Sequence, residues 1–275
     1  MSGAVNQPDI DGRNAAFWDE LCGSVAAQQL GMTGNDRASL ARYDAWFFDY
    51  YPYLARFIPF ASLRDKDVLE VGLGYGTVSQ RIAESRARLT ALDIAAGPVG
   101  GVNHRLAQSG LPGKAVQGSI LDAPFPDASF DYVVSIGCFH HTGNLTRALA
   151  ETARVLKPGG GATLMTYNAT SYLRWLRTPG RLVRYIGEMQ AGDLSPLPHN
   201  APTEYDANSK GEAPPDTVLV SRTHFRRLLE SHFRSVKIAT ANAAPLPRMQ
   251  RLPRSFWLAT LGAFAGLDLY ANVTK

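Results

Sequence analysis

Short apolar runs alternate with amphipathic stretches through the middle of the chain. Five mostly apolar runs between turn residues predict strands at 68–71, 88–93, 115–118, 132–136 and 162–167. Helical spacing of apolar residues predicts helices at 76–85, 95–110 and 145–156. After an interruption, a helix at 221–231 and strands at 235–241 and 267–274 complete the pattern. This alternation predicts an α/β fold whose mostly parallel sheet carries helices on both faces.

Three segments lie outside this alternation. Residues 1–12 are polar and expected to be loose, whereas 14–30 and 35–59 have the spacing of helices, the second capped by Asn35-Asp36 and rich in aromatics. A long connection follows residue 168, and connections of this length commonly form lids. We therefore predict an N-terminal helical cap (1–60), a core (61–168 and 221–275) and a lid insertion (169–220). A second insert spans 243–266.

A glycine-rich corner follows the first strand. Val68–Val71 runs into Gly72, Gly74 and Gly76, and glycines there allow positive φ and leave no Cβ between backbone and ligand. Asp93 ends the second strand 21 positions after Gly72, near the spacing at which an acid meets the ribose hydroxyls of a bound nucleotide. A dinucleotide site would have a small residue where Thr77 stands. The corner therefore favours another adenosine ligand.

With Glu70 in front, the corner reads E-x-G-x-G-x-G, which resembles motif I of the class I S-adenosylmethionine-dependent methyltransferases. The Pro124–Asp131 turn, the paired histidines after the fourth strand and the segment Leu156-Lys157-Pro158-Gly159-Gly160 resemble the small-molecule and quinone branch of that family. The resemblance in motifs covers about 60–168. For 221–275 it rests on the order of helices and strands alone. It implies a Rossmann-like sheet of seven strands with the last strand antiparallel.

The same resemblance implies S-adenosylmethionine as the cofactor and S-adenosylhomocysteine as the product. It assigns the cofactor site to Glu70, Gly72, Gly74, Gly76, Asp93, Ile94, Ser119, Ile120, Ile136 and Gly137. Ser119 departs from the pattern, because relatives usually have an acid there for the adenine amino group. A hydroxyl binds such an edge more weakly than a carboxylate, and Asp122 is a candidate substitute.

The candidates for acid–base chemistry follow the fourth and fifth strands. His140 and His141 are placed to titrate near neutrality beside a substrate, and Tyr167 is a further candidate. Tyr205-Asp206 in the insertion is another. The competing interpretation makes both histidines structural. No metal site is expected, because adjacent side chains diverge and no other ligands stand at recognisable spacing.

The acceptor site is the least specified part. Tyr43, Phe47 and Tyr50 are expected to cover the cofactor, although simple packing on the sheet would also explain them. Arg174 and Tyr205 are candidate contacts from the insertion. The arginines of 174–184 are a solvated helix face, a positive lip for an anionic acceptor, or a membrane-facing surface, and the sequence does not choose.

Bulk properties narrow the remaining choices. The 275 residues carry a net charge of +4 without a concentrated basic stripe, so no nucleic-acid partner is expected. Cys22 and Cys138 are expected to be reduced core thiols, and no secretory signal or membrane span is visible, which predicts a cytoplasmic protein. A homodimer stays open.

We expect methyl transfer to an O, N or C atom of a small molecule, in natural-product biosynthesis. The alternatives are an NAD(P)-dependent oxidoreductase and a non-catalytic S-adenosylmethionine-binding protein. A nucleic-acid methyltransferase is a fourth reading, but the tetrapeptide that would mark one after the fourth strand is absent, since Gly137-Cys138-Phe139-His140 stands there.

Overall fold

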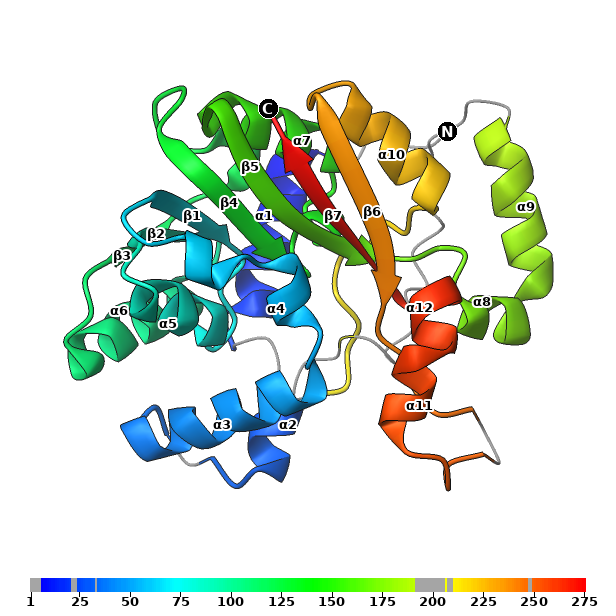
Figure 1. The fold of residues 1–275 in the computed structure, drawn as a ribbon, viewed down its shortest axis with the longest axis horizontal. Helices are drawn as coiled ribbons and strands as arrows, with labels where there is room; N and C mark the ends of the chain where they lie inside the picture. The colour runs from blue at the N-terminus through cyan, green and yellow to red at the C-terminus, as the bar shows by residue number, and fades with distance from the viewer. Residues whose placement is uncertain (1–5, 21–23, 33, 191–205, 207–209, 247–248) are drawn as a thin grey trace.

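A single twisted sheet of seven strands organises the molecule (Figure 1). The computed structural model describes residues 6–20, 24–32, 34–190, 206, 210–246 and 249–275. The strand order is β3-β2-β1-β4-β5-β7-β6, and β7 runs antiparallel to both neighbours. The strands are β1 (Asp67–Val71), β2 (Arg88–Asp93), β3 (Lys114–Gln117), β4 (Phe130–Ile136), β5 (Leu156–Tyr167), β6 (Ser235–Ala241) and β7 (Asp268–Thr274). The predicted fold class is confirmed.

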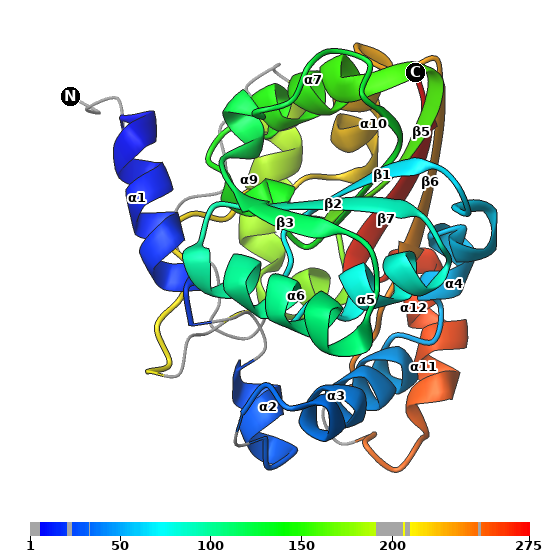
Figure 2. The ribbon, with the colours of Figure 1, turned by 90° about the vertical axis from the view of Figure 1, so that its left-hand side faces the viewer.

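Alternate strand residues face two separate apolar cores, as the period of two in a pleated strand requires. Val68 packs with α4, α5 and α6 on one face, whereas its neighbour Leu69 packs with α7 and α10 on the other. Figure 2 shows these helices as layers on opposite sides of the sheet. Their bounds are α4 (Leu54–Phe57), α5 (Thr77–Glu84), α6 (Ala96–Ser109), α7 (Leu145–Val155) and α10 (Arg222–Glu230). The predicted core helices agree with these bounds to within two residues.

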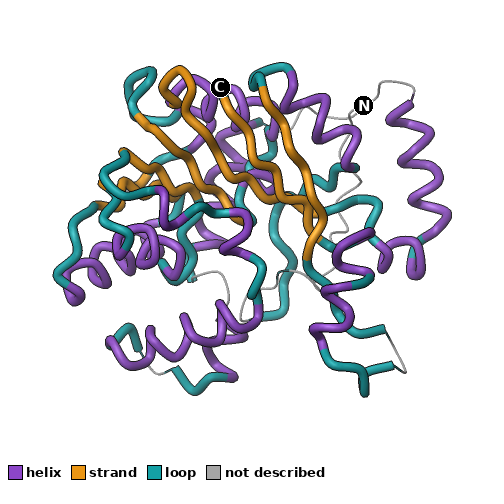
Figure 3. Tube along the Cα trace, viewed as in Figure 1, coloured by secondary structure: helices purple, strands orange, loops and turns teal. Residues whose placement is uncertain are grey.

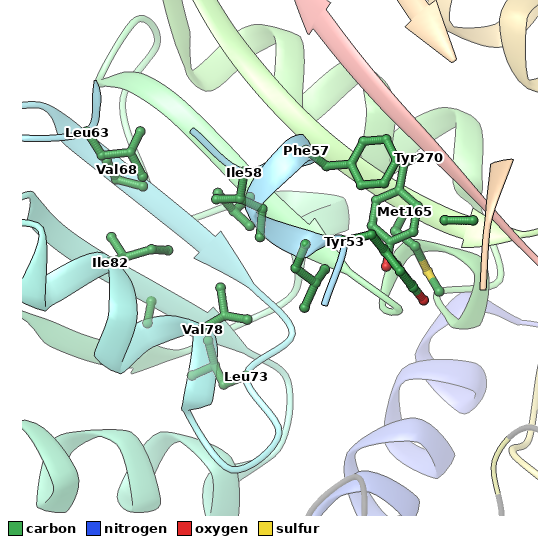
Figure 4. Close-up of a cluster of buried hydrophobic side chains, with 14 of the residues drawn as sticks. Tyr53, Phe57, Ile58, Leu63, Val68, Leu73, Val78, Ile82, Met165 and Tyr270 are labelled. Atoms are coloured by element: carbon green, nitrogen blue, oxygen red, sulfur yellow. The ribbon is translucent and has the colours of Figure 1, made fainter. Parts of the chain in front are cut away.

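The first core extends from the sheet toward the N-terminal helices. Figure 4 shows Leu63, Val68 and Ile82 at one end of it and Tyr53, Phe57 and Tyr270 at the other. The rings of Phe57 and Tyr270 stack with centroids 4.2 Å apart. This aromatic packing fixes α4 against β7, the last strand of the chain.

The N-terminal segment differs from its prediction. Instead of a loose tail and one helix over 14–30, the described residues form α1 (Gln7–Trp18) and α2 (Ser24–Gln29). Pro8 in the first turn and Asp9 favour this start. Gln7 also donates to the carbonyl of Thr142, a contact 135 positions away that no local pattern reveals.

The second predicted helix also divides. Asp36 caps α3 (Arg37–Tyr50) by accepting from the amides of Ala38 and Ser39. The helix ends two residues before Pro52, which lacks the amide that the next turn would need. The short η1 (Phe60–Ser62) then leads from α4 into the sheet.

The two insertions are helical where the structure describes them. The predicted basic helix is two helices, α8 (Tyr172–Arg177) and α9 (Pro179–Gln190), because Pro179 favours a new helix start. The second insert carries α11 (Arg254–Ala259) and α12 (Leu261–Ala265). Figure 3 shows all four helices beside the β6 edge of the sheet.

Strand β5 begins six residues before its predicted start. Leu156 already pairs with Phe130, and the ladder resumes at Gly161 with Tyr132 after a register shift. The Lys157–Gly160 turn therefore lies within the strand as an irregularity. Among the described residues, no helix is both long enough and apolar enough to cross a membrane.

Candidate functional site

A cavity of about 220 Å³ opens at the carboxyl ends of the central parallel strands. Its floor is the corner after β1 together with the ends of β2, β4 and β5, and helices α1 and α3 close it from the other side. Strand ends beside a reversal of strand order are where open α/β sheets bind ligands. Here the order reverses between β1 and β4.

The glycine corner is shaped by close contact with the turn after β4. Gly72 has φ 82°, and a Cβ there would lie 2.4 Å from the Cβ of Cys138. Gly74 has φ 48° and lines the cavity. Gly76, with φ 73°, is absent from the lining, since it begins α5 and a Cβ there would meet Val102 at 2.8 Å. Two of the three predicted glycines therefore face the cavity, and the third is needed for packing.

Two acids stand beside this corner. The Asp93 carboxylate accepts from the amides of Leu73 at 2.8 Å and Ala95 at 3.0 Å, which fixes both oxygens at the cavity wall. Burial raises its pKa. Glu70 accepts from the Ser79 hydroxyl, and burial raises the pKa of Glu70 to about 8. The corner thus holds two carboxyl groups in different environments, and Glu70 keeps its proton near neutral pH.

The remaining predicted cofactor residues also line the cavity. Ile94 and Ser119 follow β2 and β3, Ile120 begins η2 (Ile120–Asp122), and Ile136 and Gly137 end β4. The Ser119 hydroxyl accepts from the amide of Leu121 at 3.2 Å. Asp122 is exposed and absent from the lining, so it does not take the place that an acid has in relatives.

The two histidines of η3 (Phe139–His141) have different surroundings. His141 lines the cavity, while His140 is fully buried behind it, with its ring centroid 4.0 Å from that of Tyr167. Burial lowers the pKa of His140 far below its ordinary value, so its ring is neutral. His140 is therefore not a group that contacts substrate, contrary to the prediction, because its ring points into the protein.

His141, Asp206 and Tyr167 form a polar corner of the cavity. The Asp216 carbonyl accepts from His141 Nδ1 at 2.8 Å, so the other ring nitrogen, Nε2, faces Asp206 at 3.4 Å. The Tyr167 hydroxyl donates to the same Asp206 oxygen at 2.5 Å. Two predicted candidates, His141 and Tyr167, therefore meet around an acid from the insertion.

The prediction that the side chains of His140 and His141 diverge is wrong. Adjacent side chains were expected to diverge, but within the tight η3 turn the two imidazole rings lie 4.2 Å apart. One donor atom from each of His140, His141 and Asp206 falls within 4.8 Å of the others. The turn, rather than the sequence spacing, brings them together.

An aromatic wall covers the cavity. It consists of Trp18, Tyr43, Phe47, Tyr51 and Tyr270. Tyr43 packs on Tyr75 of the glycine corner at 4.5 Å, and Trp18 packs on His141 at 4.9 Å. The wall therefore spans from the corner after β1 to the polar corner.

Some predicted acceptor contacts lie elsewhere. Tyr50 is absent from the lining because its ring lies under the Arg254 guanidinium at 3.9 Å. Arg174 is half-buried on α8, also away from the cavity, and Tyr205 is outside the described residues. No lysine or arginine of the described chain lines the cavity. Of the three interpretations of the arginines, a positive lip around this cavity is therefore not supported.

Helix α1 supplies residues that the sequence pattern missed, namely Asp11, Asn14 and Trp18. Asn14 donates to the His141 carbonyl at 2.6 Å, and Asp19 accepts from the amide of Gly97 at the start of α6 at 2.7 Å. Gly97 permits this approach, because a Cβ there would lie 2.2 Å from the Asp19 carbonyl oxygen. No sequence feature marked these contacts, since each depends on tertiary docking.

Comparison with known proteins adds an independent finding. The family described as methyltransferase domain matches residues 68–160, which include the glycine corner, Asp93 and both histidines. An uncharacterised methyltransferase of Mycobacterium tuberculosis is 31% identical over 169 residues, covering 59% of this chain and 77% of that protein. A fatty-acid O-methyltransferase of Mycolicibacterium smegmatis is 37% identical over 102 residues, 36% of each chain.

Solved structures share the fold. A methyltransferase of Thermotoga maritima, described as S-adenosylmethionine-dependent and as a possible histamine N-methyltransferase, superposes with a TM-score of 0.51 at 16% identity. The match covers 86% of this chain and 95% of that one. At this identity the likeness concerns architecture and carries no information on the acceptor.

Proposed function

Because this chain belongs to the class I S-adenosylmethionine-dependent methyltransferases, we propose that it methylates a neutral, largely apolar small molecule held under the N-terminal helices. The observation that carries this proposal is one continuous cavity. It joins the glycine corner with Asp93 to an aromatic wall and a polar corner. A cofactor and its acceptor can therefore lie side by side.

On the cofactor side, the proposed roles follow from charge and position. Asp93 is fixed by two backbone amides and keeps lone pairs for two neighbouring hydroxyls, as a ribose presents. The Asp93 carboxylate favours the positive charges of the cofactor's sulfonium and ammonium groups, and Glu70 offers a carboxyl group for hydrogen bonding. Ile94, Ile120 and Ile136 offer apolar contact, and Gly72, Gly74 and Gly137 allow close backbone approach.

On the acceptor side, the described lining is aromatic. It carries acidic side chains and His141 but no lysine or arginine. An anionic acceptor would meet unfavourable charge there, so we propose a neutral one. The similarity to a fatty-acid O-methyltransferase supports an apolar acceptor, although it covers only about a third of each chain. A role in natural-product biosynthesis rests on the resemblance to the small-molecule branch alone.

The cofactor already carries the activated methyl group, so the protein chiefly aligns the acceptor and excludes water. His141 and Tyr167 are the proposed catalytic residues, because both line the cavity at the polar corner. His140 is proposed as a positioning residue behind them. Residues 169–220 are proposed as the acceptor-side insertion, since Asp206 reaches this corner and Asp216 fixes the tautomer of His141.

Calorimetry with S-adenosylhomocysteine and NADH tests the cofactor. We expect binding of the first only, weakened by about 1–3 kcal/mol in Asp93→Asn and unchanged in the exposed control Asp122→Asn. Binding of NADH instead would contradict the proposal. So would equal affinity for S-adenosylhomocysteine in the Asp93 variant.

Transfer of labelled methyl from S-adenosylmethionine to a panel of apolar alcohols, phenols, amines and carbon acids tests turnover. His141→Gln should lose most turnover while it binds S-adenosylhomocysteine normally. Cofactor binding without transfer to any member of a broad panel would favour the non-catalytic alternative.

A further inference from the structure

The polar corner contains an imbalance of donors and acceptors. Both ring nitrogens of His140 are buried without a hydrogen-bond partner in the described chain, and Nε2 of His141 also lacks one. Buried polar atoms in folded proteins nearly always have a partner, and each unmet one costs about 1–3 kcal/mol. The three unmet nitrogens lie on two rings beside one carboxylate, and a group bound between them would partner one nitrogen of each ring.

The tautomer of His141 limits what that group can be. Its Nδ1 donates to the Asp216 carbonyl, which leaves Nε2 facing an Asp206 oxygen 3.4 Å away without a hydrogen bond to it. A positively charged group between this nitrogen and the carboxylate would be attracted by both. Metal-binding histidines commonly have this arrangement, with one nitrogen held by a carbonyl and the other on the ion.

Distances agree with such an ion. Ligand atoms at about 2.1 Å from a tetrahedral centre lie about 3.4 Å from one another, which is the separation of His141 Nε2 and Asp206 Oδ2. A nitrogen of His140 completes a set within 4.8 Å. Contraction of the wider separations by up to about 1.4 Å would bring all three onto one ion.

We propose that His140, His141 and Asp206 bind a divalent first-row transition metal ion at the wall of the cavity. Two imidazoles and one carboxylate are a ligand set typical of Zn²⁺ and non-haem Fe²⁺ sites that keep positions open for substrate. Because His141 and Asp206 line the cavity while His140 lies behind it, the open positions face the acceptor space.

This inference rests on the proposed methyl transfer and narrows its acceptor to an oxygen nucleophile. A hydroxyl on the ion releases its proton to solvent more readily. Its oxygen then forms the bond to the methyl carbon as the carbon–sulfur bond of the sulfonium breaks. The products are the methyl ether, neutral S-adenosylhomocysteine and one proton.

Titration of chelator-treated protein with Co²⁺, followed by its visible absorption and by calorimetry, tests the site without any turnover. We expect one ion per chain, with affinity at least about tenfold weaker in His141→Gln and in Asp206→Asn. Tyr167→Phe keeps all three ligands but removes the hydrogen bond to the Asp206 oxygen, so it should weaken Co²⁺ binding less than either ligand change does. His104→Gln removes an exposed histidine on α6 and is the control for surface binding.

Binding of Co²⁺ that is equal in the parent, His141→Gln and Asp206→Asn proteins would overturn the metal site and leave a water or a His141–Asp206 ion pair as the missing partner. S-adenosylhomocysteine affinity of the same metal-free samples reports on the fold and on the proposed function separately. If that affinity is intact while Co²⁺ does not bind, only this inference fails. If S-adenosylhomocysteine does not bind to folded parent protein, the methyltransferase proposal fails instead.

Discussion

Burial sets the charge of individual side chains around the cavity. Glu70 is close to fully buried and has one hydroxyl donor, from Ser79, so desolvation dominates and its carboxyl group keeps a proton near neutral pH. Asp67, on the same strand, has the opposite environment. Arg88 and Lys157 donate to it and hold its pKa far below the ordinary value. Two acids three residues apart therefore differ in charge because of their partners.

The pH dependence of stability should reveal the proton that Glu70 holds in the folded protein. The unfolded chain releases this proton near pH 4.5, whereas the folded protein holds it until about pH 8. The contribution of Glu70 is therefore present below pH 4.5 and lost as the pH rises to about 8. Glu70→Gln should flatten the loss of unfolding free energy between pH 5 and 8, by roughly a few kcal/mol. Urea unfolding of the parent and the Glu70→Gln variant at several pH values measures this difference. Parallel plots of unfolding free energy against pH for the two proteins would contradict the prediction.

Glycine is required at one position of the corner after β1 and is dispensable in the middle of α6. Gly72→Ala adds a Cβ 2.4 Å from that of Cys138 at φ 82°, so we expect a loss of about 2–4 kcal/mol in unfolding free energy. Gly100→Ala is the matched control, since nothing lies within 4 Å in the middle of α6. It should stabilise by about 0.5–1 kcal/mol. Equal effects of the two changes would show that crowding at Gly72 is unimportant.

At the scale of elements, a few buried polar contacts hold the aromatic wall over the sheet. Helix α3 carries Tyr43 and Phe47, and Asp44 between them accepts from Thr77 at 2.7 Å and pairs with Arg105. The Arg105 side chain is only 4% exposed, so water does not solvate its positive charge and the Asp44 carboxylate balances it. The helix is thus fixed to α5 and α6 by polar as well as apolar contacts.

Removal of the Asp44 carboxylate should loosen α3. Asp44→Ala leaves a buried guanidinium without its acid, and we expect a loss on the order of 3 kcal/mol and faster hydrogen exchange in 37–50. Asp49→Ala, on an exposed position of the same helix, should change stability by less than about 0.5 kcal/mol. Exchange in α3 that stays as slow as in the Asp49 control would contradict this role.

The elements themselves were largely predictable. The limits of β2, β6 and α10 follow from local apolar patterning, because each is bounded by turn residues or by a cap such as Ser221. Helix α1 was not predictable, since its weakly amphipathic sequence is stabilised by contacts to the turn after β4. A local pattern predicts which face of a helix is buried. It does not predict which part of the chain packs against that face.

Across the whole molecule, segments far apart in sequence close the structure around the site. Arg254 of α11 donates to the Tyr50 carbonyl and to the Asn242 side chain, and its guanidinium covers the Tyr50 ring. The second insert is thereby joined to the end of α3. Arg254 therefore helps to hold the aromatic wall in place.

Arg254→Gln should weaken the contact between the second insert and the end of α3. We expect a loss of about 2 kcal/mol in unfolding free energy, from the charged hydrogen bonds and the cation–π contact. The acceptor KM should rise while S-adenosylhomocysteine affinity changes little, because Arg254 contacts the end of α3 and does not line the cavity. The exposed Arg251→Gln is the control and should leave both unchanged. A fall in cofactor affinity as large as the effect on the acceptor would show that the insert supports the whole core.

The α/β class, the glycine corner and the acid after the second strand could be recognised in the chain alone, because these depend on neighbours within about 25 positions. Which histidine faces the cavity, which aromatic residues cover it and how Asp206 joins His141 and Tyr167 became known from the folded structure. A side chain's charge, tautomer and exposure are set by what packs against it. Here those partners arrive from α1, the insertion and the last strand, at separations that no local pattern encodes.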